Sequence, residues 1–462
     1  MAWGWGNGDD KEDASKEAGS MIDNAGSLID VSAKMQVFLD NARNKFEDRY
    51  KDVKLRVTLP ALIQLVIQAQ AKTPSDTEFS RDKMYNTAGD VTEINAKELE
   101  GLDRSLNFAE WAYLTSTKEL EKNLSSCGYS LLKHEKVDEA GNVGYFIAID
   151  PETKTAVIGI KGTSSLSDML TDCCAATSRQ ALDHSFIADD DSFKEISAHE
   201  GILFSSNALA KSLKPFVKDL FLPLDYRLCL YGHSLGAGAA TLTGLLLRSQ
   251  YPELIPNHRL EVMAFASPPV LDHKAASACS SFTTTIVNNS DVITRTSLNN
   301  VEVLLQILSK IQEKLVEAGM DPVDMQSTAA YLSKIREGKG GEMLMTAEEG
   351  FNVLDEAQKN VSVDDPDHLY VPGKVILLYR KWQDRKKRRE DLEEMEQVAK
   401  GKGESFSEKE AVKDQPPLLV YYVRTDGIAD PLRLIEIDDD MMKDHLIGSY
   451  HMVVDSLKMT ST

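Results

Sequence analysis

The chain has 462 residues, 42% of them hydrophobic and 27% charged, so it can form one large globular domain with additions, or two domains. Its formal net charge is −21, from 73 acidic and 52 basic residues. A surface this acidic repels nucleic acid at long range, which argues against a nucleic-acid partner unless a local basic patch opposes the average.

The cysteines and the apolar segments indicate a protein of a reducing compartment. The five cysteines are odd in number and irregularly spaced, which favours free thiols over disulfide bonds or a zinc site. The N-terminus lacks the apolar core of a signal peptide, and no stretch reaches the roughly 18 apolar residues that a membrane span needs. We therefore expect a soluble, cytoplasmic protein.

The N-terminal part of the chain is expected to be mainly helical. Residues 1–10 are expected to be disordered, and residues 11–100 to form a helical N-terminal region with apolar residues at helical spacing. Pro60 is expected to start a new helix at its first turn. Residues 73–100 are polar and loop-like, whereas residues 104–122 have the pattern of one amphipathic helix.

Apolar strands then alternate with helices. Residues 144–149 and 155–161 flank a short turn, which predicts a hairpin. Further strands are expected at 227–231, 260–266 and 283–287, with helices at 203–220 and 235–250. This alternation predicts a mostly parallel central sheet with helices on both faces.

Two insertions interrupt the expected α/β domain, which comprises residues 101–297 and 367–462. Residues 298–366 have the pattern of a helical insertion. Residues 381–417 are charged and contain several glycines, so we expect a flexible charged insertion between two strands of a hairpin. A last strand and a last helix are expected at 432–437 and 441–457.

A G-x-S-x-G motif carries the chemistry of the chain. It reads Gly232-His233-Ser234-Leu235-Gly236, between an apolar strand and a helix of small residues. This context predicts a nucleophile elbow, a tight turn in which Gly232 and Gly236 leave room and the hydroxyl of Ser234 is exposed. The motif therefore predicts an α/β-hydrolase fold with Ser234 as the nucleophile.

A nucleophilic serine needs a base, and the base needs an acid that orients it. In this fold the acid and then the base follow the serine along the chain. Asp291 follows a strand, at the edge of the sheet where catalytic groups gather. His445 is expected in the loop before the last helix or at the start of that helix, and it is the preferred base, with His368 in reserve; His451 is expected inside the helix.

The oxyanion hole needs two backbone donors. One is expected to be the N–H group of Leu235, which follows the nucleophile, and the other that of Thr163, in the turn after strand 155–161.

At this point the sequence resembles the class 3 lipases, the family typified by fungal triacylglycerol lipases and sn-1-specific diacylglycerol lipases. The resemblance covers residues 140–457 and rests on seven segments in the family's order: AVIGIKGTSSLSDMLTD, AHEGI, YGHSLGAGAA, AFASPPV, IVNNSDVITR, LYVPGKVILL and MKDHLIGSY. It implies the same nucleophile, acid, base and oxyanion donors. The long insertion in the last hairpin resembles the diacylglycerol lipases more closely.

The expected function is hydrolysis of acyl esters of di- or triacylglycerol, through an acyl-enzyme on Ser234 and without a metal or cofactor. A phospholipase A1 or galactolipase remains an alternative, because the pocket and lid decide the head group. A lipase-like scaffold without catalysis is a second alternative, although Ser234, Asp291 and His445 argue against it.

Two segments are expected to meet lipid. Residues 164–198 combine apolar side chains with many acids, which predicts a mobile cap over the site or, equally, packing on the core. A basic cluster beside Trp382, from Arg380 to Arg389, predicts peripheral contact with a membrane or lipid droplet. A solvated helix in which neighbouring acids pair with these bases is the alternative.

Overall fold

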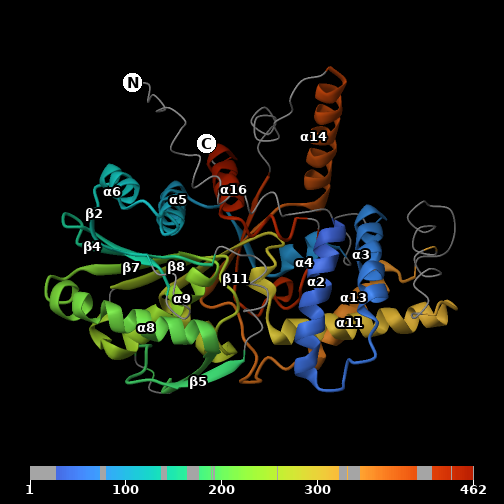
Figure 1. Ribbon diagram of the computed structural model, residues 1–462, viewed down its shortest axis with the longest axis horizontal. Coiled ribbons are helices and arrows are strands. Elements are labelled where there is room, and N and C mark those ends of the chain that lie inside the picture. The colour runs from blue at the N-terminus through green and yellow to red at the C-terminus, as the bar shows by residue number, and fades with distance from the viewer. Residues whose placement is uncertain are drawn as a thin grey trace.

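A nine-stranded sheet forms the centre of the part of the chain that the structure describes (Figure 1). The structure is a computed structural model that describes residues 28–72, 80–136, 143–163, 176–188, 190, 193–256, 259–321, 330, 344–402, 419–438 and 440–460. The strand order is β1-β11-β10-β9-β8-β7-β4-β3-β2. The strands are β1 Asp90–Thr92, β2 Ser130–Glu135, β3 Tyr145–Asp150, β4 Thr155–Ile160, β7 Arg227–His233, β8 Leu260–Phe265, β9 Thr283–Asn288, β10 Lys374–Tyr379 and β11 Tyr421–Thr425.

The middle of the sheet is parallel and its margins are antiparallel. Strands β4, β7, β8, β9 and β10 pair in parallel, so their carboxyl ends meet at one edge. Strands β3 and β2 extend one margin, and β11 and β1 extend the other. This arrangement, with the predicted hairpin of β3 and β4, is an α/β-hydrolase fold. Strands β1 and β2 were not predicted, because they are short or largely polar.

Helices cover both faces of the sheet, as predicted. α5 Ala96–Trp111, α6 Thr117–Ser126 and α16 Ile447–Thr460 lie on one side, and α8 Glu200–Phe216 and α9 Leu235–Gln250 lie on the other (Figure 1). Side chains of β7 alternate between the two layers: Leu228 and Leu230 join the core under α8 and α9, whereas Cys229 joins the core under α5 and α6. A short helix, α10 His273–Ala278, follows β8.

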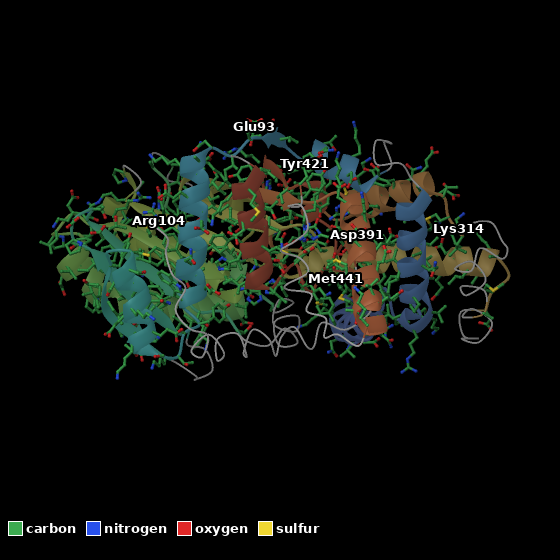
Figure 2. All side chains as sticks on the ribbon, turned by 90° about the horizontal axis from the view of Figure 1, so that it is seen from above. Glu93, Arg104, Lys314, Asp391, Tyr421 and Met441 are labelled. Atoms are coloured by element: carbon green, nitrogen blue, oxygen red, sulfur yellow. The ribbon has the colours of Figure 1, made fainter. Side chains whose placement is uncertain are left out.

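A second, helical core lies beside the sheet. It contains α2 Leu28–Arg43 and α3 Leu55–Lys72 from the N-terminal region, and α11 Leu298–Glu317 from the insertion between β9 and β10. α13 Ala347–Asn360 packs on α11. Seen from above, Arg104 on α5 and Lys314 on α11 lie toward opposite ends of the elongated molecule (Figure 2). α2 and α3 thus share one core with α11, which begins more than 220 residues later in the chain.

Three predictions in the N-terminal and C-terminal parts are wrong. Pro60 lies inside α3 instead of starting a helix, because Leu55 and Leu59 before it are buried in the helical core. The supposed loop 73–100 contains α4 Arg81–Thr87 as well as β1 and the first turn of α5. The segment 432–437 forms no strand. Its alternation of apolar and charged residues arises because Ile435 and Ile437 enter the helical core, whereas Glu436 pairs with charged side chains.

The segment expected to be one helix, 104–122, is two. α5 ends at Trp111, and Ser116 caps the start of α6 by accepting a hydrogen bond from the backbone N–H of Glu119. The turn between the two helices contains Tyr113, whose hydroxyl contacts His233.

The charged insertion begins as a helix and not as an irregular segment. α14 Trp382–Lys402 projects from the body of the molecule (Figure 1). Its sequence is rich in Arg, Lys, Glu and Gln, which are good helix formers. Arg380 does not belong to a surface cluster, because it is buried and paired with Asp444. Contact of the other bases with a lipid surface stays a prediction, and residues 403–418 lie outside the described residues.

The expected cap is described only in part. Residues 177–181 and 195–199 form the antiparallel strands β5 Thr177–Ala181 and β6 Glu195–His199. Phe186 and Ile196 are fully buried in the main core, so they are not the lipid-facing side chains that a cap would expose. Leu166, Met169 and Leu170 lie outside the described residues. No helix in the described part of the chain is both long and apolar enough to cross a membrane.

We predict that Leu308→Ala lowers the free energy of unfolding by about 2–5 kcal/mol, because Leu308 is fully buried in the helical core and its truncation leaves a cavity. Val316→Ala on the same helix is the control, since Val316 is 57% exposed; it should change stability by less than about 0.5 kcal/mol. Urea denaturation measures both. Equal effects would show that α11 is not packed as described.

Candidate active site

Ser234 lies in a sharp turn between β7 and α9. Its φ is 62° and its ψ is −134°, a strained conformation for a residue with a side chain. A Cβ on Gly232 would lie 2.3 Å from the carbonyl oxygen of Gly236, and one on Gly236 would lie 2.4 Å from that of Ile160. Both positions therefore require glycine, and the strand-to-helix turn has the form of a nucleophile elbow.

The structure brings Ser234, His445 and Asp291 into one chain of hydrogen bonds. Nδ1 of His445 lies 3.0 Å from Oδ1 of Asp291, and Nε2 of His445 lies 3.0 Å from Oγ of Ser234. A carboxylate only accepts, so Nδ1 carries the proton and Nε2 is the acceptor for the serine hydroxyl. All three residues are buried, so the prediction that the hydroxyl of Ser234 is exposed is wrong for this structure. They come from the turn after β7, the turn after β9 and the loop before α16.

Donors on both oxygens hold Asp291 in its ionised form. Burial alone would raise its pKa, but the nearby His445, with hydrogen bonds from His445 and Tyr450, brings the pKa below its ordinary value. The hydroxyl of Tyr450 donates to Oδ2 across 2.8 Å, and the backbone N–H of Ile293 donates to Oδ1 across 2.9 Å. Sequence reasoning missed Tyr450, although it ends the motif that contains His445.

The turn after β4 lies against the elbow. A Cβ on Gly162 would lie 2.6 Å from the carbonyl oxygen of His233 and 3.3 Å from the backbone nitrogen of Gly236. Thr163 is the next residue, and its hydroxyl is buried without a hydrogen-bond partner among the described residues. Leu235 is the first residue of α9, and the first N–H groups of a helix have no acceptor within it. Thr163 and Leu235 therefore flank the same small region beside Ser234.

His233 links these parts, and sequence reasoning missed it. Its Nε2 lies 2.8 Å from the carbonyl oxygen of His445, so Nε2 carries the proton and Nδ1 accepts from the hydroxyl of Tyr113 at 3.2 Å. Burial, reinforced by the neighbouring His445, lowers the pKa of His233 to about 3. His233 is therefore a neutral bridge between the turn after α5, the elbow and the loop of His445.

The other two histidines that follow Asp291, His368 and His451, lie away from Ser234. His368 is held by the carbonyl oxygen of Ser362, 2.7 Å from its Nδ1. His451 is inside α16, with its Nε2 3.2 Å from a carboxylate oxygen of Glu110. Within the described residues, no group of three or more His, Cys, Asp or Glu side chains could hold a metal ion.

Comparison with known proteins confirms the resemblance that the motifs predicted. Residues 157–301 match the model of the class 3 lipase family, and they include the elbow and Asp291. Mouse diacylglycerol lipase-beta is 30% identical over 185 residues, which are 38% of this chain and 25% of that protein. Human diacylglycerol lipase-alpha is 30% identical over 167 residues, 34% of this chain and 15% of that protein. The chain thus spans a quarter or less of the length of these relatives.

Solved structures of fungal lipases are similar at lower identity. Lip2 lipase from Yarrowia lipolytica is 18% identical, with a TM-score of 0.36, and the match covers 44% of this chain and 77% of that one. Rhizomucor miehei lipase, in its propeptide complex, is 19% identical with a TM-score of 0.36 and coverage of 49% and 73%.

We predict that His233→Gln flattens the acid dependence of stability. The folded protein keeps His233 neutral, whereas the unfolded chain takes up a proton below about pH 6.5, so acid favours unfolding. The stability is therefore full above pH 6.5 and falls as the pH decreases toward 3. Between pH 6.5 and 5, the wild type should lose roughly 1–2 kcal/mol more than the variant in urea titrations. Parallel curves would mean that His233 is not buried in its neutral form.

Proposed function

We propose that this chain is a serine lipase that hydrolyses acyl esters of glycerolipids, with Ser234 as nucleophile, His445 as base and Asp291 as acid. The observation that carries the proposal is the hydrogen-bonded chain from Ser234 through His445 to Asp291 at a strained elbow. The match of residues 157–301 to class 3 lipases supports ester hydrolysis as the reaction.

The first step is acylation. Oγ of Ser234 attacks the ester carbonyl carbon as its proton passes to Nε2 of His445, and Asp291 stabilises the resulting imidazolium through Nδ1. The backbone N–H groups of Thr163 and Leu235 stabilise the negative oxygen of the tetrahedral intermediate. The hydroxyl of Thr163, which has no hydrogen-bond partner among the described residues, is a third donor for the same oxygen. Collapse of the intermediate breaks the ester bond, and His445 returns the proton to the departing alcohol.

The second step is deacylation. Water attacks the acyl-enzyme and gives a proton to Nε2 of His445, and the second tetrahedral intermediate uses the same oxyanion donors. Its collapse releases the fatty acid and returns the proton to Ser234. Each step needs an imidazole that is unprotonated at Nε2, which is the tautomer that Asp291 holds.

Diacylglycerol is the first substrate to test, because both relatives described above are named for it. Triacylglycerol is the second. A phospholipase A1 or galactolipase activity remains the alternative within ester hydrolysis, since the acyl-transfer groups are common to these enzymes. Peripheral contact with a membrane or droplet surface would bring the enzyme to such substrates and is part of the proposal.

We predict that Ser234→Ala lowers ester hydrolysis by about 10⁴–10⁶-fold without unfolding the protein. Alanine also carries a Cβ, so the strain at φ 62° is unchanged. Hydrolysis of diacylglycerol, triacylglycerol, phosphatidylcholine and galactolipid is measured for both proteins, together with labelling by a fluorophosphonate.

The wild type should be labelled at Ser234 and should cleave an acylglycerol fastest. Labelling that persists in the alanine variant would show that another residue is the nucleophile. Fastest cleavage of a phospholipid or galactolipid would replace the substrate class, and wild type that neither reacts nor cleaves would be a scaffold.

We predict that His445→Ala lowers kcat on a soluble short-chain ester by at least about 10⁴-fold, whereas His368→Ala stays within threefold of wild type. His445 contacts Ser234, and His368 is bonded to Ser362 in a different part of the fold. Steady-state kinetics of the two variants provide the comparison. A larger loss at His368 would contradict the assignment of the base.

A further inference from the structure

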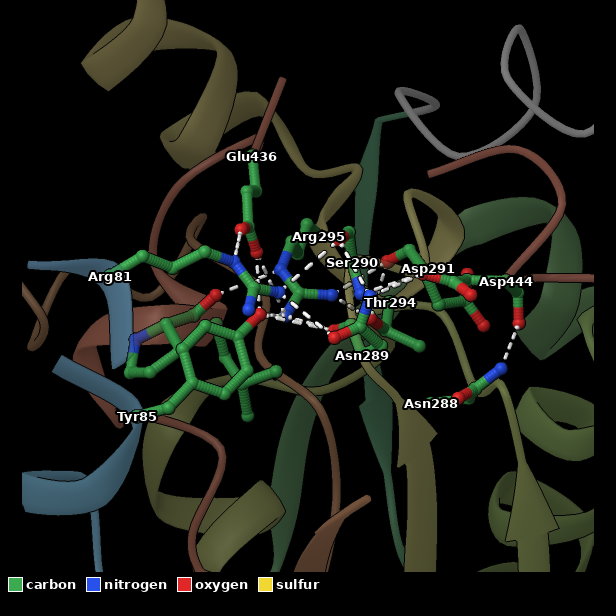
Figure 3. A network of polar contacts seen from close by, with 12 residues as sticks. Arg81, Tyr85, Asn288, Asn289, Ser290, Asp291, Thr294, Arg295, Glu436 and Asp444 are labelled. Atoms are coloured by element: carbon green, nitrogen blue, oxygen red, sulfur yellow. Dashed lines mark hydrogen bonds and ion pairs between the residues drawn. The ribbon is translucent and has the colours of Figure 1, made fainter. Parts of the chain in front are cut away.

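A buried cluster of charges lies behind the acid and base of the proposed triad. Arg295, Arg380 and Asp444 have side chains that are at most 5% exposed, and those of Arg81 and Glu436 are 9% exposed. They come from α4, the turn after β9, the position directly after β10 and the loop before α16. Figure 3 shows Arg81, Arg295, Glu436 and Asp444 around the turn that contains Asp291. Only Arg295 lies within the region that matches the lipase family.

Burying so many charges costs several kcal/mol for each ion unless they are paired and bonded in a fixed geometry. Stability alone is therefore a weak reason for such a cluster, since an apolar core would serve as well. Such a cluster does fix the positions of the segments that it joins relative to one another.

Asp444 makes the contacts nearest to the triad. It precedes His445 and forms an ion pair with Arg380. Its Oδ2 accepts from the side chain of Asn289 at 2.6 Å and from the backbone N–H of Ser290 at 3.2 Å. These two residues directly precede Asp291. One carboxylate thus ties the loop of the base to the loop of the acid.

A backbone contact reinforces this tie. The side-chain amide of Asn288 donates to the carbonyl oxygen of Asp444 across 2.9 Å. Asp444 is therefore bonded through its side chain and its backbone to three consecutive residues before Asp291. The loop of His445 cannot shift along the turn after β9 without breaking these bonds.

The remaining charges hold the acid loop from its other side. Arg295 donates to the carbonyl oxygens of Asp291 and Asn289, each at 2.8 Å. Arg81 of α4 pairs with Glu436 and donates to Oδ1 of Asn289 at 3.0 Å. The N-terminal helix α4 is thereby connected to the same loop (Figure 3).

We propose that Asp444 and Arg380 are positioning residues, whose buried ion pair fixes His445 against Asp291. This inference rests on the proposed function, because it assigns a role in orienting the base of that reaction. Neither residue touches the substrate; each acts through the loop that carries His445.

The test compares two variants with a matched control. Asp444→Asn removes the charge but keeps the shape, and Arg380→Lys keeps a cation but loses the planar fork. Arg424→Gln removes an arginine from an ion pair with Glu98 at the surface of the same sheet. In the folded enzymes, kcat on a soluble ester should fall about 10–100-fold for Asp444→Asn and about 3–10-fold for Arg380→Lys. KM should stay within twofold, and Arg424→Gln should match wild type.

A spectroscopic readout separates positioning from activity. The proton between Nδ1 of His445 and Asp291 gives a downfield NMR resonance, assigned by its loss in His445→Ala. It should be lost or broadened in Asp444→Asn, retained in Arg424→Gln and intermediate in Arg380→Lys. If wild type hydrolyses no ester, the proposed function fails, yet this resonance still tests the positioning.

Wild-type kcat and an unchanged resonance in folded Asp444→Asn would overturn the inference. So would a loss of activity that the unfolded fraction, measured by near-UV circular dichroism, fully accounts for. If Asp444→Asn does not fold, Arg380→Lys provides the test, because the buried carboxylate of Asp444 still has a cation beside it in that variant. Wild-type kcat and resonance in that variant would then overturn it.

Discussion

The close approach of three backbones at the elbow is the constraint on which the rest of the site depends. The end of β4, the end of β7 and the start of α9 approach one another closely, because Gly162, Gly232 and Gly236 carry no Cβ at the contacts. This contact permits the positive φ of Ser234. It also places the turn that contains Thr163 beside Ser234. Fixing the position of Ser234 therefore also fixes that of Thr163.

The proposed acid, Asp291, and the proposed base, His445, lie on loops, and these loops need their own support. The support here is polar: Tyr450 and Ile293 donate to the Asp291 carboxylate, and Asp444 bonds the residues before it. Buried polar groups demand directed bonds, so they define the geometry of a loop more narrowly than apolar packing does. The sheet is the rigid part of the site, and the buried charged residues bond the loops to it in a fixed position.

The sequence predicted the parts of the molecule that have a period or an order. Long apolar strands such as β7 and β8 stood out, and strand–motif–helix order singled out Ser234, Asp291 and His445, which the structure places together. Partners of buried polar groups were not predictable, because a single Tyr113, Arg81 or Asp444 has no pattern until the chain is folded. The strand predicted at 432–437 was wrong for a related reason. Apolar and polar residues alternate there because Ile435 and Ile437 enter the helical core and Glu436 pairs with Arg81, not because the segment has the two faces of a strand.

The shared core of the helical part constrains the order of folding during synthesis. Residues of α2 and α3 pack on α11 and on Met441 and Met442, so their partners emerge from the ribosome hundreds of residues later. At about 5–20 residues per second, the first helices remain with exposed apolar faces for tens of seconds. We therefore expect chaperones that shield those faces to assist the nascent chain, and we expect substitutions in α2 or α3 to affect the yield of folded protein even where the final stability is unchanged.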